Sequence, residues 1–63
     1  MTPGNYLDII IRKKGMGQQQ LAKEAGIAQS SLSRILNDKQ LPNFKLLSVL
    51  RVKYKVDINK FFK

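Results

Sequence analysis

The sequence predicts an all-α protein, a compact arrangement of five short helices in one domain that spans residues 1–63. Three observations predict this class. Apolar residues recur three and four positions apart through most of the chain, as they do along one face of a helix. Glycine, asparagine, aspartate and proline interrupt this pattern where caps and turns are needed. No segment alternates apolar and polar residues as a strand would, and the nearest candidate, 53–56, is too short.

The first helix is expected at 6–14, after a frayed lead-in at 1–4. Asn5 is positioned to cap it, because an asparagine side chain can accept a hydrogen bond from a free backbone N–H of the first turn. Its buried stripe should consist of residues spaced three and four apart. These are Leu7, Ile10 and Ile11.

Two further helices are expected in the C-terminal third of the chain. One should run over 44–54, capped by Asn43 and preceded by the helix-blocking Pro42. A short last helix should follow the capping Asp57 and carry Ile58, Phe61 and Phe62. The apolar periodicity of the longer helix predicts its core positions as Phe44, Leu47, Leu50 and Tyr54.

The most informative stretch covers residues 17–37 and reads GQQQLAKEAGIAQSSLSRILN. Two apolar-periodic segments, Gln18–Ala25 and Gln29–Leu36, are separated by one glycine and two small or apolar residues. Gly26 permits the positive φ that ends a helix sharply. A helix, a tight turn and a second helix form the layout of the DNA-binding helix-turn-helix. We therefore expect the second segment to lie in a DNA major groove.

The charge of the chain favours a polyanionic partner. Twelve lysines and arginines against four acids give a net charge of +8, and each phosphate that a basic residue neutralises releases condensed counterions. Charge alone would also suit RNA, the ribosome or an anionic membrane. No apolar run approaches the roughly 20 residues of a membrane span, no signal peptide is apparent, and cysteine is absent. We therefore expect a cytoplasmic protein without disulfides.

The residue inventory is unlike that of an enzyme. The sequence contains neither histidine nor cysteine, and its acids, Asp8, Glu24, Asp38 and Asp57, stand 14 to 19 residues apart. Metal-ligand clusters, activated nucleophiles and glycine-rich phosphate loops are all missing. We therefore expect a binding module without catalytic residues, metal, cofactor or small-molecule substrate.

The second motif helix carries a polar face that is suited to reading bases. Gln29 stands at its open N-terminal end, and Ser30, Ser33 and Arg34 lie opposite its apolar stripe of Leu32, Ile35 and Leu36. Arginine pairs with O6 and N7 of guanine, glutamine with N6 and N7 of adenine, and serine with either base. These four polar residues are the predicted base readers. The alternative is that Arg34 contacts only phosphate and the serines fill a solvent-exposed face.

Four other residues are predicted to contact the DNA backbone. Gln18 opens the first motif helix, where free N–H groups and the positive dipole end suit a phosphate. Asn37 and Lys39 flank the other end of the reading helix, and Lys45 lies in the first turn of the helix that follows. Such contacts position a protein on DNA and carry little sequence information. For each lysine the alternative is an ordinary solvent-exposed charge.

Together these residues resemble the phage repressor/Cro (lambda-repressor-like, XRE) helix-turn-helix family. The matching motif positions are Gln18, Leu21, Ala22, Gly26, Ile27, Gln29, Ser30, Leu32, Ile35 and Asn37. The match continues without gaps through Pro42, Phe44, Leu47, Leu50, Val56, Ile58, Phe61 and Phe62 and so covers about residues 7–62.

The resemblance implies the five-helix fold of that family and specific contacts with DNA. It implies a phosphate contact for Gln18, base-facing positions for Gln29, Ser30 and Arg34, and an approach of Asn37 to the backbone. It further implies dimers on inverted-repeat operators, with reading helices about 34 Å apart. Three residues depart from the pattern. Ala28 replaces the customary Ser or Thr cap, at a cost of about 1 kcal/mol, and Asp38 brings a negative charge where glycine is frequent. Arg51 stands where the family usually has an alanine packed on the core, so its stem is expected along the core edge with its guanidinium in solvent.

The favoured function is therefore a sequence-specific, double-stranded DNA-binding transcriptional regulator, expected to be a repressor. A weak or DNA-induced homodimer is expected through apolar residues of the C-terminal helices, namely Leu46, Val49, Val52 or Phe62. The alternative class is a protein-interaction module, such as an antitoxin or anti-repressor-type partner on the same fold. A non-specific RNA- or membrane-binding peptide is disfavoured, because the helices are short and tryptophan is absent.

Overall fold

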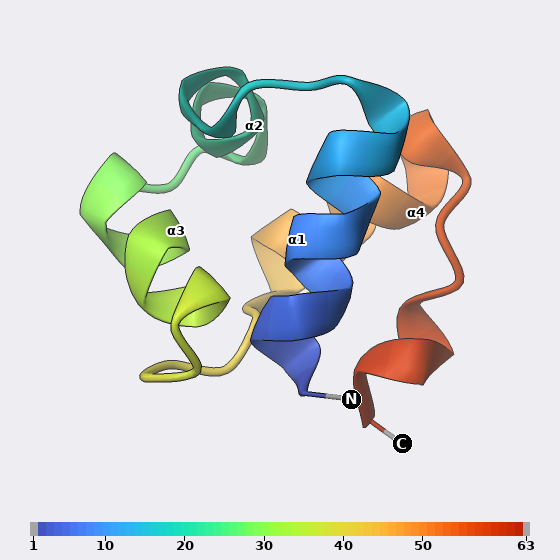
Figure 1. The fold of residues 1–63 in the computed structure, drawn as a ribbon. Helices are drawn as coiled ribbons and strands as arrows, with labels where there is room; N and C mark the ends of the chain where they lie inside the picture. Colours follow the sequence, from blue (N-terminus) through green and yellow to red (C-terminus); the bar gives the residue numbers. More distant parts are fainter. Residues whose placement is uncertain (1, 63) are drawn as a thin grey trace.

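A computed structural model describes residues 2–62, and this part of the chain forms four α-helices followed by one 3-10 helix (Figure 1). The elements in chain order are α1 (Pro3–Lys14), α2 (Gln18–Ala25), α3 (Gln29–Leu36), α4 (Phe44–Tyr54) and η1 (Ile58–Phe62). The all-α prediction is confirmed, but the fifth element is a 3-10 helix. Its first turn is closed by the N–H of Lys60, which donates to the carbonyl of Asp57 three residues earlier (3.4 Å).

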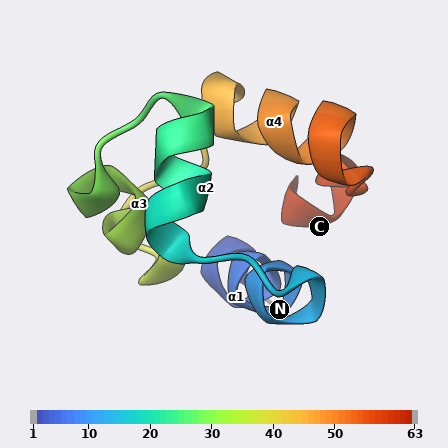
Figure 2. The same ribbon diagram turned by 90° about the horizontal axis from the view of Figure 1, so that it is seen from above.

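The helix-turn-helix has the predicted bounds at both helices. Figure 2 shows α2 and α3 joined by a short loop at one edge of the molecule. Gly26 has φ 70°, and its N–H donates to the carbonyl of Lys23 (3.2 Å) while Ile27 N–H donates to that of Ala22 (3.0 Å). These bonds satisfy the last carbonyls of α2. The left-handed glycine therefore turns the chain sharply enough for α3 to begin three residues later.

The start of α1 differs from the prediction. The helix begins at Pro3, and its cap is Thr2, whose Oγ1 accepts a hydrogen bond from the N–H of Asn5 (3.1 Å). Proline is favoured at the first helical position because the N–H it lacks has no partner there. The predicted capping role of Asn5 is thus wrong, as is the expectation of a frayed segment at 2–4; Met1 lies outside the described residues.

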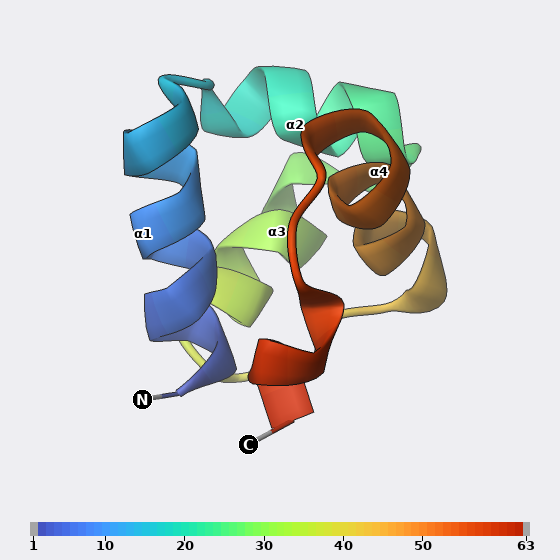
Figure 3. The same ribbon diagram turned by 90° about the vertical axis from the view of Figure 1, so that its right-hand side faces the viewer.

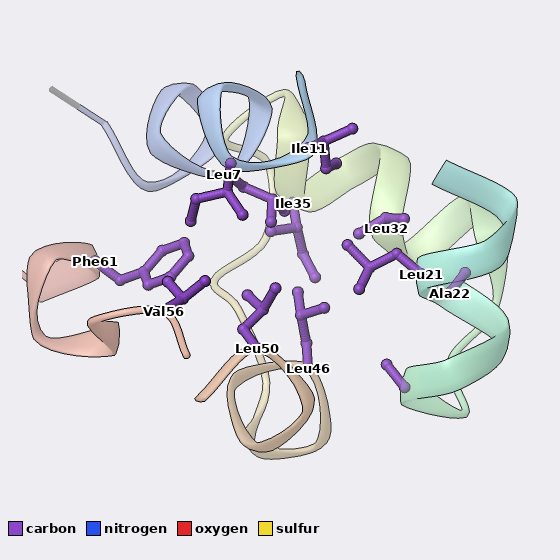
Figure 4. Close-up of a cluster of buried hydrophobic side chains, with 12 residues drawn as sticks. Leu7, Ile11, Leu21, Ala22, Leu32, Ile35, Leu46, Leu50, Val56 and Phe61 are labelled. Carbon is purple, nitrogen blue, oxygen red and sulfur yellow. The ribbon is translucent and has the colours of Figure 1, made fainter. Parts of the chain in front are cut away.

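One apolar core joins the five elements (Figure 4). Its fully buried large side chains are Leu7, Leu21, Leu32, Ile35, Leu46 and Leu50. The side chains of all four α-helices meet at its centre, while Val56 and Phe61 close the side toward η1. Burial of this kind stabilises a protein by roughly 1.5–3 kcal/mol per large side chain. The core therefore fixes how α3 is presented at the surface.

The core face of α4 is rotated from the predicted one. Leu46 is fully buried, whereas Phe44 is 79 % exposed, and Leu47 and Tyr54 are only half-buried. Leu50 belongs to both the predicted and the observed stripe. Apolar residues occupy most of the circumference of α4, so periodicity alone does not distinguish the two faces. Leu46 was also expected on a dimer surface, and its burial excludes it from that role.

The C-terminal segment folds back onto the first helix. Figure 3 shows it passing from the end of α4 to η1, which lies beside the N-terminal half of α1. The rings of Tyr6 and Phe61 meet edge to face with centroids 4.8 Å apart, and the Tyr6 hydroxyl donates to the carbonyl of Asp57 (3.2 Å). Burial of Tyr6, reinforced by the nearby charge of Asp57, raises its pKa above the usual 10.0. None of the described helices has the length and apolar character of a membrane span.

Candidate nucleic-acid interface

The outer face of α3 is polar and open to solvent. Gln29, Ser30, Ser33 and Arg34 are all exposed, whereas Leu32 and Ile35 on the opposite side of the helix are fully buried. Figure 1 shows α3 at one edge of the molecule and the C-terminal segment at the opposite edge. The core thus anchors one side of the helix and leaves the four predicted base readers together on the other.

The two ends of α3 are capped differently. No side chain among the described residues caps its N-terminus, where Ala28 is the N-cap, so the first N–H groups remain available beside Gln29 and Ser30. At the other end Asn37 is the C-cap, and its Nδ2 donates to the carbonyl of Ser33 (2.9 Å). Asn37 keeps a second amide N–H with which it can approach a phosphate.

A polar hollow of about 290 Å³ lies beside the C-terminal half of α3. It brings together three predicted DNA contacts from different elements, namely Gln18 at the start of α2, Ser33 of α3 and Asn37. The N-terminus of α2 has only Gly17 as its cap, without a side-chain hydrogen bond in the described structure. The start of a helix with free N–H groups, next to side-chain amides, suits an anion such as a DNA phosphate.

Two side chains of α1, Asn5 and Asp8, also line this hollow and were not expected there. The carboxylate of Asp8 forms an exposed ion pair with Arg12 one turn later (3.2 Å), which offsets part of its charge. Local periodicity gives no signal for such residues. Their position depends on how α1 packs against α3, a contact between segments about twenty-five residues apart in the sequence.

Lys39 and Lys45 do not line the hollow, and both are exposed. The backbone N–H of Lys39 donates to the carbonyl of Arg34 (2.9 Å), which holds the lysine at the end of α3. Lys45 lies in the first turn of α4, next to the cap in which Asn43 Oδ1 accepts from Leu46 N–H (2.9 Å). Within the described part of the chain neither lysine side chain has a hydrogen bond or ion pair, so both present a positive charge to solvent, one at the end of α3 and one at the start of α4.

Asp38 follows α3 in the left-handed conformation, with φ 60°. Its Oδ1 accepts a hydrogen bond from the N–H of Gly4 at the start of α1 (2.9 Å). The negative charge that was expected to oppose DNA phosphates is thus engaged with the positive end of a helix.

The residues that the structure describes include no group of three or more acidic, histidine or cysteine side chains able to hold a metal ion. The outer face of α3 presents amides, hydroxyls and a guanidinium that can form hydrogen bonds, and positively charged side chains lie at its margins. Such groups recognise nucleic acids by contact with base edges and phosphates.

Comparison with known proteins agrees with this geometry. A protein-family model described as helix-turn-helix matches residues 9–61, most of the chain. Neither the search of curated proteins nor the search of solved structures found a match. The family is one of DNA-binding regulators and not of enzymes. On the matched residues and the fold, the chain belongs to the phage repressor/Cro-type helix-turn-helix family.

Proposed function

We propose that this protein is a sequence-specific regulator that binds double-stranded DNA and reads the major groove with α3. The observation that carries the proposal is the exposed polar face of α3, which presents Gln29, Ser30, Ser33 and Arg34 on a helix whose other side is buried. A major groove admits one α-helix, and these side chains match base edges there.

The backbone of the DNA is proposed to lie along the edges of this face. Gln18 and Asn37, which share the polar hollow with Ser33, would hold one phosphate near the N-terminus of α2. Lys39 and Lys45 would contribute charge on the side of the α3–α4 loop. Contacts of this kind fix the register of the protein and leave the choice of sequence to the base readers.

We further propose a homodimer that is weak or forms only on DNA, bound to an inverted-repeat operator. The surface that supports it is the outer side of α4, where Val52 is 73 % exposed and a hollow of about 400 Å³ is lined by Ser48, Val49 and Val52 together with Glu24 and Lys53. The described molecule measures 26 × 24 × 21 Å. Two such molecules side by side can place their α3 helices about 34 Å apart, one turn of DNA. The side chain of Phe62, also expected in this contact, lies outside the described residues.

Selection of bound duplexes from a random library at moderate salt tests the central proposal. Enrichment of an inverted repeat is expected, because each half-site would meet one α3. Binding without enrichment would contradict sequence-specific reading and leave only phosphate attraction. The same surface would then be better explained as a protein-interaction module on this fold.

The oligomeric state is tested by analytical ultracentrifugation of the free protein and of its complex with the enriched duplex. Two protein copies per duplex are expected, and Val52→Asp should reduce this to one by placing a charge in the apolar contact. One copy of the wild-type protein per full inverted repeat would rule out the dimer. Repression follows if the bound dimer blocks access to a promoter, which a reporter carrying the enriched site would show as reduced expression.

A further inference from the structure

We propose that Asp38 is a positioning residue for DNA reading: its carboxylate ties the C-terminal end of α3 to the start of α1 and so fixes the orientation of the base-reading face. The inference rests on the proposed function for its consequence on DNA. Its structural content, a tether between two helix ends, is independent of that function.

The contact joins residues 34 positions apart in the sequence. The N–H of Gly4 donates to Asp38 Oδ1 at 2.9 Å, and Gly4 stands in the first turn of α1. N–H groups of a first helical turn have no partner within the helix. A carboxylate there both accepts that hydrogen bond and lies at the positive end of the helix dipole, so the bond is charge-assisted.

Gly4 permits an approach that no other residue would. A Cβ atom at this position would lie 2.4 Å from the carbonyl oxygen of Leu36, 2.8 Å from that of Ile35 and 2.9 Å from Asp38 Oδ1. The backbone of the first turn of α1 therefore packs directly against the last turn of α3. Two helix ends in contact at this distance cannot move independently.

The backbone of Asp38 also indicates a role for its side chain. With φ 60°, the residue adopts a left-handed conformation that glycine reaches without a steric penalty. Glycine would satisfy the turn, but it could not reach Gly4. The aspartate tolerates the turn and adds the contact.

The tether matters because α3 is short and no side chain in the described part of the molecule caps its other end. Eight residues span about 12 Å, so a tilt of roughly 10° about the C-terminal end would move Gln29 and Ser30 by about 2 Å. Recognition groups must be held to within roughly 0.5 Å. Leu32 and Ile35 anchor the middle of the helix and its buried side, and the Asp38 tether adds a constraint at its end.

Asp38→Gly and Asp38→Asn form a matched pair that separates this role from stability. Glycine relieves the left-handed strain and removes the tether, so the melting temperature should change little. Asparagine keeps both the turn and the accepting oxygen. Amide hydrogen exchange of Gly4 and of 34–37 is measured by NMR in the free proteins. Affinity is measured for the duplex enriched by the wild type and for a scrambled duplex of equal length and composition.

Asp38→Gly should speed amide exchange at Gly4 and in the last turn of α3 by about tenfold, which corresponds to the loss of one hydrogen bond. It should also lower the ratio of the affinity for the enriched duplex to the affinity for the scrambled duplex by about tenfold. Asp38→Asn should retain most of both. Unchanged exchange and an unchanged ratio in Asp38→Gly would overturn the proposal. If the wild type enriches no site, the proposed function fails, and the tether is then judged by amide exchange alone. Faster exchange in Asp38→Gly supports the tether, and unchanged exchange refutes it.

Discussion

Glu24 is the one acid within the helix-turn-helix, and three side chains donate hydrogen bonds to its carboxylate. They are Lys53 (2.6 Å) and Tyr54 (2.5 Å) at the end of α4, and Gln20 (3.3 Å) one turn earlier in α2. The bond from Lys53, followed by that from Tyr54, holds the pKa of Glu24 below its usual value. The same contacts raise the pKa of Lys53 and that of Tyr54. This cluster connects α2 with the end of α4.

The lowered pKa of Glu24 predicts a loss of stability in acid. A carboxylate whose pKa is lower in the folded state stabilises the fold above its unfolded value and loses that contribution as pH falls through the folded value. The melting temperature of the wild type should therefore drop below pH 4.5, the ordinary value of the group, more steeply than that of Glu24→Gln. Circular dichroism across this range measures it.

Asp8→Asn is the control for the acid prediction, because the ion pair of Asp8 with Arg12 is more exposed than that of Glu24 with Lys53. It should keep most of the acid dependence of the wild type. Melting curves for Glu24→Gln and the wild type that stay parallel down to pH 3 would contradict the account of this cluster.

At the scale of the elements, the close packing of α1 against α3 predicts an effect of Gly4→Ala. The added Cβ would meet two backbone carbonyls of α3, so the helix ends must separate, at a cost of about 1–3 kcal/mol. Urea denaturation should show this loss of stability. Gly17→Ala is the control, because its Cβ would enter open space and only the cap preference, at most about 1 kcal/mol, opposes it. Equal stability of Gly4→Ala and the wild type would contradict the packing.

Elements with strong local signals were predictable from the sequence. Gly26 and the two apolar stripes define α2 and α3, and Asn43 defines the start of α4, where the side chain accepts from the N–H of Leu46 as a cap should. By residue type Asn5 is a better cap than Thr2, and only the preference of Pro3 for the first helical position favours Thr2.

Features that depend on tertiary packing were not predictable. The buried side of α4 differs from the predicted one because Phe44 and Leu46 fit apolar stripes that share Leu50, and only packing against the rest of the core selects Leu46. The polar hollow and the bond between Asp38 and Gly4 join distant segments, for which one sequence carries no periodic signal. The roles of the predicted DNA contacts remain predictions.

At the scale of the whole molecule, the positive charge is not concentrated around α3. Four lysines, Lys13, Lys14, Lys55 and Lys60, line a hollow of about 260 Å³ between α1 and η1. Figures 1 and 2 place this C-terminal segment at the opposite edge of the molecule from α3. Lys13 and Lys14 also stand in the last turn of α1, where cations stabilise a helix. A large part of the net charge of +8 is therefore remote from the proposed interface.

This distribution predicts which lysines govern the salt dependence of DNA binding. Lys39→Gln and Lys45→Gln should each reduce the slope of log affinity against log salt by about 1, because each releases counterions from one phosphate. Lys13→Gln and Lys60→Gln should leave the slope unchanged. Affinity titrations at several salt concentrations give the slope for each of the four variants. Equal slopes for all four would show that the lysines act only through net charge.

The measurement that tests the central claim most directly is duplex selection with Arg34→Ala beside the wild type. Arg34 is exposed on the outer face of α3, and its loss should relax one base pair in each half-site, at a cost of about 1–3 kcal/mol. Arg51→Ala, which removes an exposed arginine from α4, should leave the selected sequence unaltered. If Arg34→Ala selects the same sequence as the wild type and loses only as much affinity as Arg51→Ala, then Arg34 does not contact a base and the proposed reading by α3 is contradicted.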